Sequence, residues 1–393
     1  MPLGIYISVP FCRTKCSYCN FASDVFSRER FRAYVQRVCA EIARATQTGE
    51  EMGGRFERGV DTVYLGGGTP SLLPAELLER VFESVRRHFE VAPDAEITVE
   101  CAPGTLAPEL VATLGRLSVN RVSLGVQSFV DGEAAAVGRR HTCAVVQDDI
   151  ARVRGAGITN LSLDLIAGLP HQTAKSWRRS LDDAIATGVP HVSVYMLEVD
   201  EDSRLGRELI AGGTRYHAHF VPDEDAIAGF YTAACEQLEA AGIHQYEISN
   251  FARPGSESWH NLKYWTRQPY LGFGVDAHSM LFAAQEGGDT VRFANTDDLE
   301  QYIVGSPLMR TPVSRAQALE ETFFLGLRLT SGVDLAAVAA QFGPEGRTLV
   351  VPILRELHAL NLIQMEGDQV SLTPSGRLLS NEVFERFLLM PAV

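Results

Sequence analysis

The stretch Cys12-Arg-Thr-Lys-Cys16-Ser-Tyr-Cys19 places three cysteines in a short loop, directly after a β-rich run at residues 4–9. Three thiolates this close together can hold one metal centre, and sulfur ligands favour zinc or an iron–sulfur cluster. Structural zinc usually takes four ligands, but residues 20–23 contain no cysteine or histidine. A [4Fe–4S] cluster held by three cysteines would keep one iron open to a small molecule. The alternatives are a small zinc site and three buried free thiols.

Strand and helix patterns alternate outward from this loop to about residue 250. Repeated strand–helix units predict parallel strands with right-handed crossovers. The two further units that a closed eight-fold barrel needs are not visible, so we expect a partial, open (β/α)6 barrel. The predicted strands are 4–9, 60–65, 96–100, 121–126, 160–166 and 191–197. The predicted helices are 28–47, 74–90, 107–116, 144–156, 173–187 and 224–241.

The rest of the chain has a different pattern. Residues 251–313 are irregular and aromatic-rich, and 270–280 is typical of a strand that closes the barrel edge. The first domain is expected at residues 1–250. After the segment 251–313, residues 314–393 predict a winged-helix-like domain. Its expected helices are 315–329, 334–341, 345–360 and 375–389, with a hairpin at 362–373.

Composition excludes several functions. The 393 residues include 35 basic and 49 acidic side chains, for a net charge of −14. A chain this acidic is neither a general nucleic-acid binder nor a polybasic membrane anchor. Hydrophobic residues make up 46% of the chain, which is typical of a globular protein.

Cysteine usage and the N-terminus indicate a cytoplasmic protein. The count of seven cysteines is odd, so a disulfide framework is not expected, and a reducing compartment keeps thiols free. The N-terminus has no basic region or cleavage site, and no apolar run reaches the roughly 18 residues that span a bilayer.

A second motif, Gly66-Gly-Gly-Thr-Pro70, follows the second predicted strand. Glycines allow the backbone to approach a ligand closely, and exposed carbonyls can accept hydrogen bonds from an ammonium group. Taken alone, the motif is equally consistent with a tight strand-to-helix turn.

The cysteine loop and the glycine motif together resemble the radical S-adenosylmethionine (SAM) superfamily. Within it, the chain resembles oxygen-independent coproporphyrinogen III oxidases and their relatives, the heme chaperones called HemW, over nearly its whole length, including the C-terminal domain. The matching stretches are Tyr6-Ile-Ser-Val-Pro-Phe-Cys12, Tyr64-Leu-Gly-Gly-Gly-Thr-Pro-Ser71, Arg121-Val-Ser-Leu-Gly-Val-Gln-Ser128, Gly138-Arg-Arg-His141 and Asp164-Leu-Ile-Ala-Gly-Leu-Pro170.

This resemblance implies cofactor-binding residues. A [4Fe–4S] cluster would be held by Cys12, Cys16 and Cys19, with SAM at the open iron. In the oxidases the positions matching Gln127, Arg139 and Asp164 contact a second SAM molecule. For Glu100, Gln127 and Asp164, ordinary hydrogen bonding at strand ends is the alternative, and for Arg139 the alternative is a solvated surface position. The full set implied for SAM is Tyr6, Tyr18, Gly67, Gly68, Thr69, Glu100, Gln127, Arg139 and Asp164.

Two departures favour the chaperones over the oxidases. The oxidases carry a further cysteine two residues after the third cluster cysteine, where this chain has Phe21, and they have a long N-terminal extension. The chaperones share the motif His260-Asn-Leu-Lys-Tyr-Trp265, which implies heme contact by His260, Asn261, Tyr264 and Trp265. Lys263 or Arg267 could pair with a heme propionate. Without the resemblance, this cluster is typical of core packing.

The expected function is therefore to bind heme and transfer it to an acceptor protein, which could be a membrane-associated respiratory enzyme. This would make the protein cytoplasmic or peripheral at the membrane. The alternative is an oxidase that decarboxylates porphyrinogen propionates. The pair His217-Ala-His219 could suggest a metal site, but a surface loop is the simpler interpretation. The sequence leaves the oligomeric state open.

Overall fold

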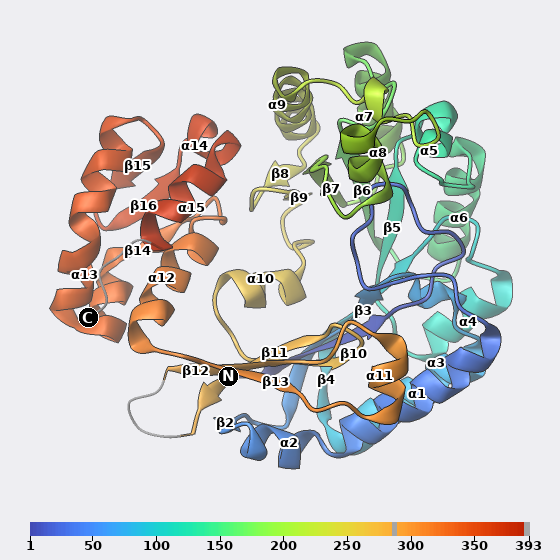
Figure 1. The fold of residues 1–393 in the computed structure, drawn as a ribbon, viewed down its shortest axis with the longest axis horizontal. Helices are drawn as coiled ribbons and strands as arrows, with labels where there is room; N and C mark the ends of the chain where they lie inside the picture. The colour runs from blue at the N-terminus through green and yellow to red at the C-terminus, as the bar shows by residue number, and fades with distance from the viewer. Residues whose placement is uncertain (285–288, 389–393) are drawn as a thin grey trace.

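The computed structural model describes residues 1–284 and 289–388. Its centre is a set of six parallel strands that lie side by side in chain order (Figure 1). They are β1 (Leu3–Val9), β3 (Gly59–Gly67), β4 (Glu90–Cys101), β5 (Arg121–Gln127), β6 (Asn160–Ala167) and β7 (His191–Met196). The predicted open barrel of six units is confirmed.

Amphipathic helices cover the outer face of these strands. The predicted helix 28–47 is broken at Arg44, while each of the others ends within two residues of its prediction. The covering helices are α1 (Arg28–Ala43), α2 (Ala45–Glu51), α3 (Ala75–His88), α4 (Pro108–Arg116), α6 (Cys143–Gly155), α7 (Ala174–Ala186) and α9 (Glu224–Ala240). Short elements that the sequence did not predict are β2 (Gly54–Arg55), η1 (Pro70–Leu72), α5 (Asp131–Ala136), α8 (Arg204–Ala211), η2 (Ala218–Phe220), β8 (His244–Gln245) and β9 (Asn250–Ala252).

The two faces of the central strands differ in polarity because side chains alternate along a strand. On β3, Val63 and Leu65 are buried in the main hydrophobic core, whereas Tyr64 lies between them on the inner face. On β4, Val99 points to the core and Glu100 inward. The barrel therefore has an apolar outside, covered by helices, and a polar lumen.

The segment after the barrel extends the sheet instead of closing it. β10 (Tyr270–Gly274) pairs parallel with β1, and three antiparallel strands follow. The sheet path runs from β13 to β8, and no pairing of its two ends is found in the described residues. The glycine-containing strand expected at 270–280 does cover the barrel edge next to β1, but it ends at Gly274 and the barrel stays open. The added elements are β11 (His278–Ala283), β12 (Thr290–Ala294), α11 (Leu299–Val304) and β13 (Met309–Val313).

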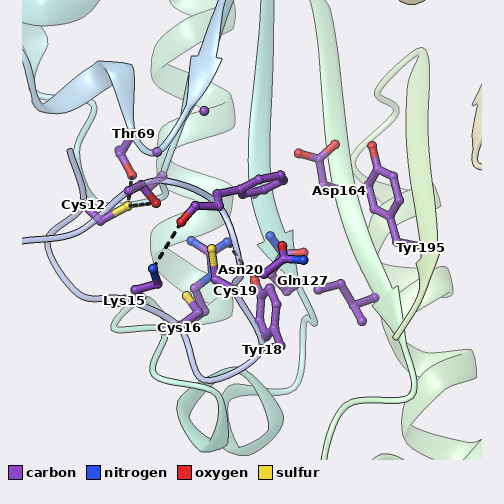
Figure 2. A pocket seen from close by; sticks show the side chains of 18 of the residues that line it. Cys12, Lys15, Cys16, Tyr18, Cys19, Asn20, Thr69, Gln127, Asp164 and Tyr195 are labelled. Carbon is purple, nitrogen blue, oxygen red and sulfur yellow. Dashed lines mark hydrogen bonds between the residues drawn. The ribbon is translucent and has the colours of Figure 1, made fainter. Parts of the chain in front are cut away.

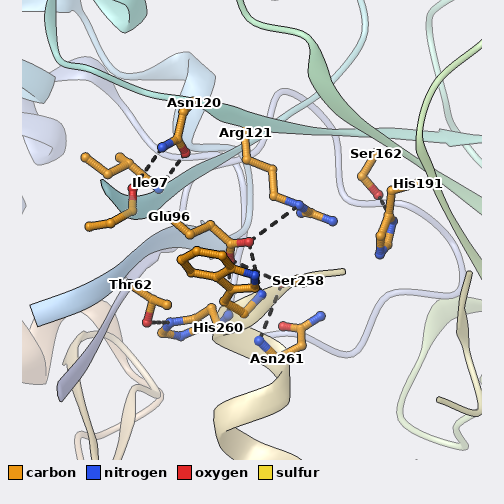
Figure 3. A network of polar contacts seen from close by, with 12 residues as sticks. Thr62, Glu96, Ile97, Asn120, Arg121, Ser162, His191, Ser258, His260 and Asn261 are labelled. Atoms are coloured by element: carbon orange, nitrogen blue, oxygen red, sulfur yellow. Dashed lines mark hydrogen bonds and ion pairs between the residues drawn. The ribbon is translucent and has the colours of Figure 1, made fainter. Parts of the chain in front are cut away.

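A short helix, α10 (Trp259–Trp265), occupies part of the segment expected to be irregular. The Ser258 side chain caps it by accepting the N–H of Asn261, and Glu96 on β4 accepts the N–H groups of Trp259 and His260 at 3.0 and 3.1 Å. A carboxylate at a helix N-terminus is favourable. Contacts that are distant in the sequence thus hold α10 against the barrel (Figure 3).

The C-terminal domain packs around a core of its own, in which Phe323 and Phe387 stack at 4.8 Å. The helices predicted at 334–341 and 345–360 form one element kinked at Gly343, where φ is 84°. The helix predicted at 375–389 is split in two, and residue 389 lies outside the described residues. The elements are α12 (Arg315–Gly326), β14 (Val333–Asp334), α13 (Leu335–Ala359), β15 (Ile363–Glu366), β16 (Gln369–Leu372), α14 (Pro374–Leu378) and α15 (Ser380–Leu388).

No described helix combines the length and apolar character needed to cross a membrane.

Candidate functional site

A cavity of about 550 Å³ opens at the carboxyl ends of the barrel strands and brings the predicted site together (Figure 2). Parallel α/β folds bind their ligands at this edge. All three clustered cysteines line it, as does every predicted SAM contact except Tyr6. The lining residues among the predictions are Cys12, Cys16, Tyr18, Cys19, Gly67, Gly68, Thr69, Glu100, Gln127, Arg139 and Asp164.

The cysteine loop is held by hydrogen bonds that leave its thiols on the cavity wall. The Thr69 hydroxyl donates to Sγ of Cys12 at 3.8 Å, and the backbone N–H of Cys19 donates to the carbonyl of Cys16 at 3.3 Å. Burial raises the pKa of the Cys19 thiol. Among the described residues, no group of three or more His, Cys, Asp or Glu side chains is arranged to hold a single metal ion. The three thiols on the cavity wall remain candidate ligands for the expected cluster.

The glycine motif forms a close backbone wall. Gly67 has a φ of 98°, which favours glycine, and its N–H donates to Oε2 of Glu100 at 3.2 Å. A Cβ atom at Gly68 would lie 2.8 Å from the carbonyl oxygens of Val9 and Phe11. No side chain could be accommodated there without a shift, so this wall can approach a ligand closely.

Glu100 and Asp164 supply buried carboxylates to the cavity. Glu100 accepts a hydrogen bond from the Tyr64 hydroxyl at 2.7 Å, and burial raises its pKa to about 7. Asp164 accepts from Ser123 at 3.1 Å, and burial raises its pKa as well. A cationic ligand would favour the ionised forms of both groups.

The wall beside β5 carries a polar atom with no partner. Nη2 of Arg139 lies 3.2 Å from the hydroxyl of Tyr18, but its buried Nε has no hydrogen-bond partner among the described residues. Gln127 is nearly buried and has a φ of 70°, a left-handed conformation that is uncommon outside glycine. A bound polar ligand could satisfy Arg139.

Together, these observations fit the cofactors that the resemblance implies. The donor set is three soft thiols, and the glycine wall, the carboxylates and the unpartnered Arg139 Nε surround the space next to them. Cys12, Cys16 and Cys19 would hold the cluster, and Gly67, Gly68, Thr69 and Glu100 would hold SAM.

Tyr6 is not among the residues that line this cavity. Its ring centroid is 6.0 Å from that of Tyr64, and the Tyr64 hydroxyl bonds Glu100. Tyr6 therefore supports the floor of the site in this structure and is not one of its lining residues.

The four residues expected to contact heme lie away from the cavity, on α10. His260 is 1% exposed. Its Nδ1 lies 2.8 Å from the Thr62 hydroxyl (Figure 3). Its Nε2 lies 2.8 Å from the Tyr264 hydroxyl. Burial lowers the pKa of His260 to about 3, so the ring is neutral. Trp265 lies under the guanidinium of Arg328, 4.2 Å from its ring centroid, and the Asn261 N–H is donated to Ser258. This arrangement matches the core-packing alternative, and heme contact by these residues stays a prediction.

The two cations expected to pair with a propionate already have carboxylate partners. Nζ of Lys263 lies 2.9 Å from Asp61. Arg267 lies between Asp289, at 2.7 Å, and Glu321, at 3.0 Å. Both cations are thus paired within the protein in this structure, and a contact of either with a propionate stays a prediction.

Sequence reasoning missed several lining residues. Asn20 donates to Asp200 at 2.9 Å, which joins the cysteine loop to the segment after β7. Phe21 and Tyr195 line the cavity and are 62% and 43% exposed, and Cys101 lines it as a buried thiol. No local signal could reveal the Asn20–Asp200 contact, because 180 positions separate the two residues.

Comparisons with known proteins show what the chain is similar to. The Radical SAM superfamily model matches residues 6–184, and the HemN C-terminal domain model matches residues 313–379. The chain is 36% identical to "Heme chaperone HemW" of Bacillus subtilis (strain 168), with 98% of each chain covered. It is 38% identical to the protein of that name from Synechocystis, over 86% of this chain and 80% of the relative, and 31% identical to that of Escherichia coli (strain K12), over 98% of both.

Among solved structures, the fold is similar to that of coproporphyrinogen III oxidase (HemN) from Escherichia coli, described as a radical SAM enzyme. The TM-score is 0.81 and the identity 23%, with 98% of this chain and 90% of the other covered. At this identity the match shows a shared fold, including the C-terminal domain.

Proposed function

Because this chain belongs to the HemW family of heme chaperones, within the radical SAM superfamily, we propose that it binds heme and transfers it to an acceptor protein. The observation that carries the proposal is the match to proteins of that name in three bacteria, at 31–38% identity over 86–98% of this chain. The family relation covers both the barrel and the C-terminal domain, so it is not a likeness of one shared module.

A [4Fe–4S] cluster and SAM accompany this function. Cys12, Cys16 and Cys19 would hold the cluster, and the chemistry it would supply when bound and reduced is one-electron transfer to SAM. The chain's own residues bind and orient: three thiols lie on one wall, and the Gly67–Gly68 backbone excludes side chains from the space beside them. Glu100 and Asp164 provide negative charge for a cationic ligand.

Coproporphyrinogen III oxidation is the alternative function, since the fold is shared with the oxidase. Phe21 favours the chaperone. It stands where the oxidases carry a further cysteine, and its ring is 62% exposed at the cavity. A bulky apolar side chain there neither ligates a metal nor transfers a proton.

In this proposal the chaperone is cytoplasmic and contacts its acceptor through its own surface. If the acceptor lies in the membrane, the chaperone would have to dock peripherally at the membrane. The seven cysteines are all free thiols, as a reducing compartment maintains them. The negative net charge does not favour direct binding to an anionic lipid surface.

One experiment separates the two functions. The protein is purified without oxygen, its cluster is reconstituted, and it is incubated with reductant, SAM and coproporphyrinogen III. In parallel, hemin is titrated and the Soret band followed. We expect a stable heme complex and no catalytic formation of protoporphyrinogen. Turnover without heme binding would instead establish the oxidase.

A further inference from the structure

Two histidines from distant loops meet at the surface, outside the cavity described above. His171 follows β6, and His217 directly precedes η2. Nε2 of His171 lies 3.2 Å from Nδ1 of His217, so the two rings share a hydrogen bond. The sequence had drawn attention to His217 with His219, but the structure pairs His217 with His171.

Phe220 joins the two histidines into one unit, which we call the imidazole platform (His171, His217 and Phe220). The backbone N–H of His171 donates to the carbonyl of Phe220, and the N–H of Phe220 donates to the carbonyl of His217, both at 2.9 Å. The rings of Phe220 and His171 stack at 4.2 Å. With the ring-to-ring bond, three hydrogen bonds close the unit and fix its geometry before any ligand arrives.

The backbone of the platform is strained at both histidines. Their φ angles are 67° and 60°, in the left-handed region. For a residue with a side chain this conformation costs about 1–2 kcal/mol, and such strain is concentrated at functional sites. Glycine would form both turns without that cost, so the positions carry imidazoles at the expense of stability.

Two ring nitrogens of the platform are open, one on each histidine. Within residues 1–284 and 289–388, neither Nδ1 of His171 nor Nε2 of His217 has a hydrogen-bond partner, and neither is among the buried polar atoms. Histidines that ligate metals usually donate their other ring N–H to a fixed partner, which sets the tautomer. Nδ1 of His217 has such a partner in His171.

The surroundings suit a flat apolar ligand with a metal at its centre. Phe220 is 57% exposed and its ring centroid lies 6.3 Å from that of His217, and imidazole is a common ligand of heme iron. Below the platform, Ala218 packs in a small apolar cluster with Ile166 and Leu197, and these two residues also line the cofactor cavity. A layer of side chains therefore connects the platform to the cavity wall.

We propose that His217 ligates the iron of the heme cargo through Nε2 and that His171 acts as a positioning residue that fixes its tautomer. This site rests on the proposed heme function. It differs from the α10 motif, in which both ring nitrogens of His260 are hydrogen-bonded inside the protein.

The test is a hemin titration of the full-length protein, followed at the Soret band. His217→Asn keeps a residue that tolerates the left-handed backbone, and we expect its Kd for hemin to rise at least about tenfold with loss of the shifted Soret band. His171→Ala should weaken binding less and change the Soret position, and His171→Gln should restore part of the affinity. His219→Ala is the matched control, an exposed histidine of the same turn, and should bind as wild type.

Each remaining outcome is decisive. If wild type binds no hemin, the proposed function itself fails. If wild type binds and His217→Asn binds equally well with the same spectrum, the platform is not the site and the heme function stands. Equal losses in His217→Asn and His219→Ala would show nonspecific surface binding and also overturn the platform. Circular dichroism of each variant distinguishes lost ligation from lost folding, and His217→Gln provides a second replacement if the first does not fold.

Discussion

The hydroxyl of Tyr64 donates a 2.7 Å hydrogen bond to the carboxylate of Glu100. The ring of Tyr64 also stacks on His260, with centroids 5.2 Å apart. One side chain of the barrel lumen thus contacts both the floor of the cofactor cavity and helix α10. Tyr64 therefore links helix α10 directly to Glu100 in the cavity wall.

The affinity for SAM should depend on pH through Glu100. Burial raises the pKa of this carboxyl group to about 7, so below that pH it is mostly protonated and no longer attracts the cationic groups of SAM. We expect SAM to bind roughly tenfold more weakly at pH 6 than at pH 8, measured by equilibrium dialysis on the reconstituted protein.

The variant Glu100→Gln is the control for this effect. It should bind SAM weakly at both pH values and lose most of the dependence. An unchanged pH profile in Glu100→Gln would show that another group titrates.

Each cluster cysteine should be individually essential. Cys12→Ala, Cys16→Ala and Cys19→Ala should abolish the iron–sulfur absorbance near 400 nm and the bound iron of the reconstituted protein, because two thiolates cannot hold the cluster. Cys235→Ala is a matched control on α9, away from the cavity lining, and should keep the full iron content. Full iron content in any of the three variants would contradict the ligand assignment.

His260 should contribute to stability. Replacing it by alanine would leave the hydroxyls of Thr62 and Tyr264 without their partner and open a cavity, for a loss of about 2–4 kcal/mol in the free energy of unfolding. Because burial lowers the pKa of His260 to about 3 from an ordinary 6.5, the unfolded chain binds a proton that the folded chain does not. Stability should therefore fall as the pH drops from about 6.5 toward 3.

Urea denaturation at pH 7 and pH 5 tests both statements. His260→Asn keeps a polar group but does not titrate, so its unfolding free energy should change less between the two pH values than that of wild type. A variant as stable as wild type at pH 7, with unchanged pH dependence, would argue that α10 is not fixed as described.

The sequence predicted what is encoded locally. The three thiols lie in one loop, and helices such as α6 and α7 carry a 3.6-residue apolar pattern that the core requires. Helix α10 was not predicted because it is seven residues long and depends on Glu96, 163 positions before Trp259. The burial of His260 follows from the same long-range contact. Motif spacing reports which residues occur together, but not which face of an element they occupy.

The link between the barrel and the C-terminal domain should depend on Arg267. This guanidinium is 7% exposed and bridges Asp289 and Glu321, and Glu321 lies on α12 of the C-terminal domain. Arg267→Met would leave two carboxylates with less compensation, and breaking such a pair typically costs about 3–5 kcal/mol. We expect a loss of about 3 kcal/mol, since Arg292 still contacts Glu321 at 3.0 Å.

The double variant Arg267→Met/Glu321→Gln should recover part of this loss, because it removes one of the uncompensated charges. Glu356→Ala is the control, since its pair with Arg386 is about half exposed and should contribute less than about 1 kcal/mol. Limited proteolysis provides an independent measurement. If Arg267 joins the two domains, Arg267→Met should be cleaved between the barrel and the C-terminal domain faster than wild type is. The double variant should be partly protected from this cleavage. Equal cleavage rates in all of these proteins would show that other contacts hold the C-terminal domain in place.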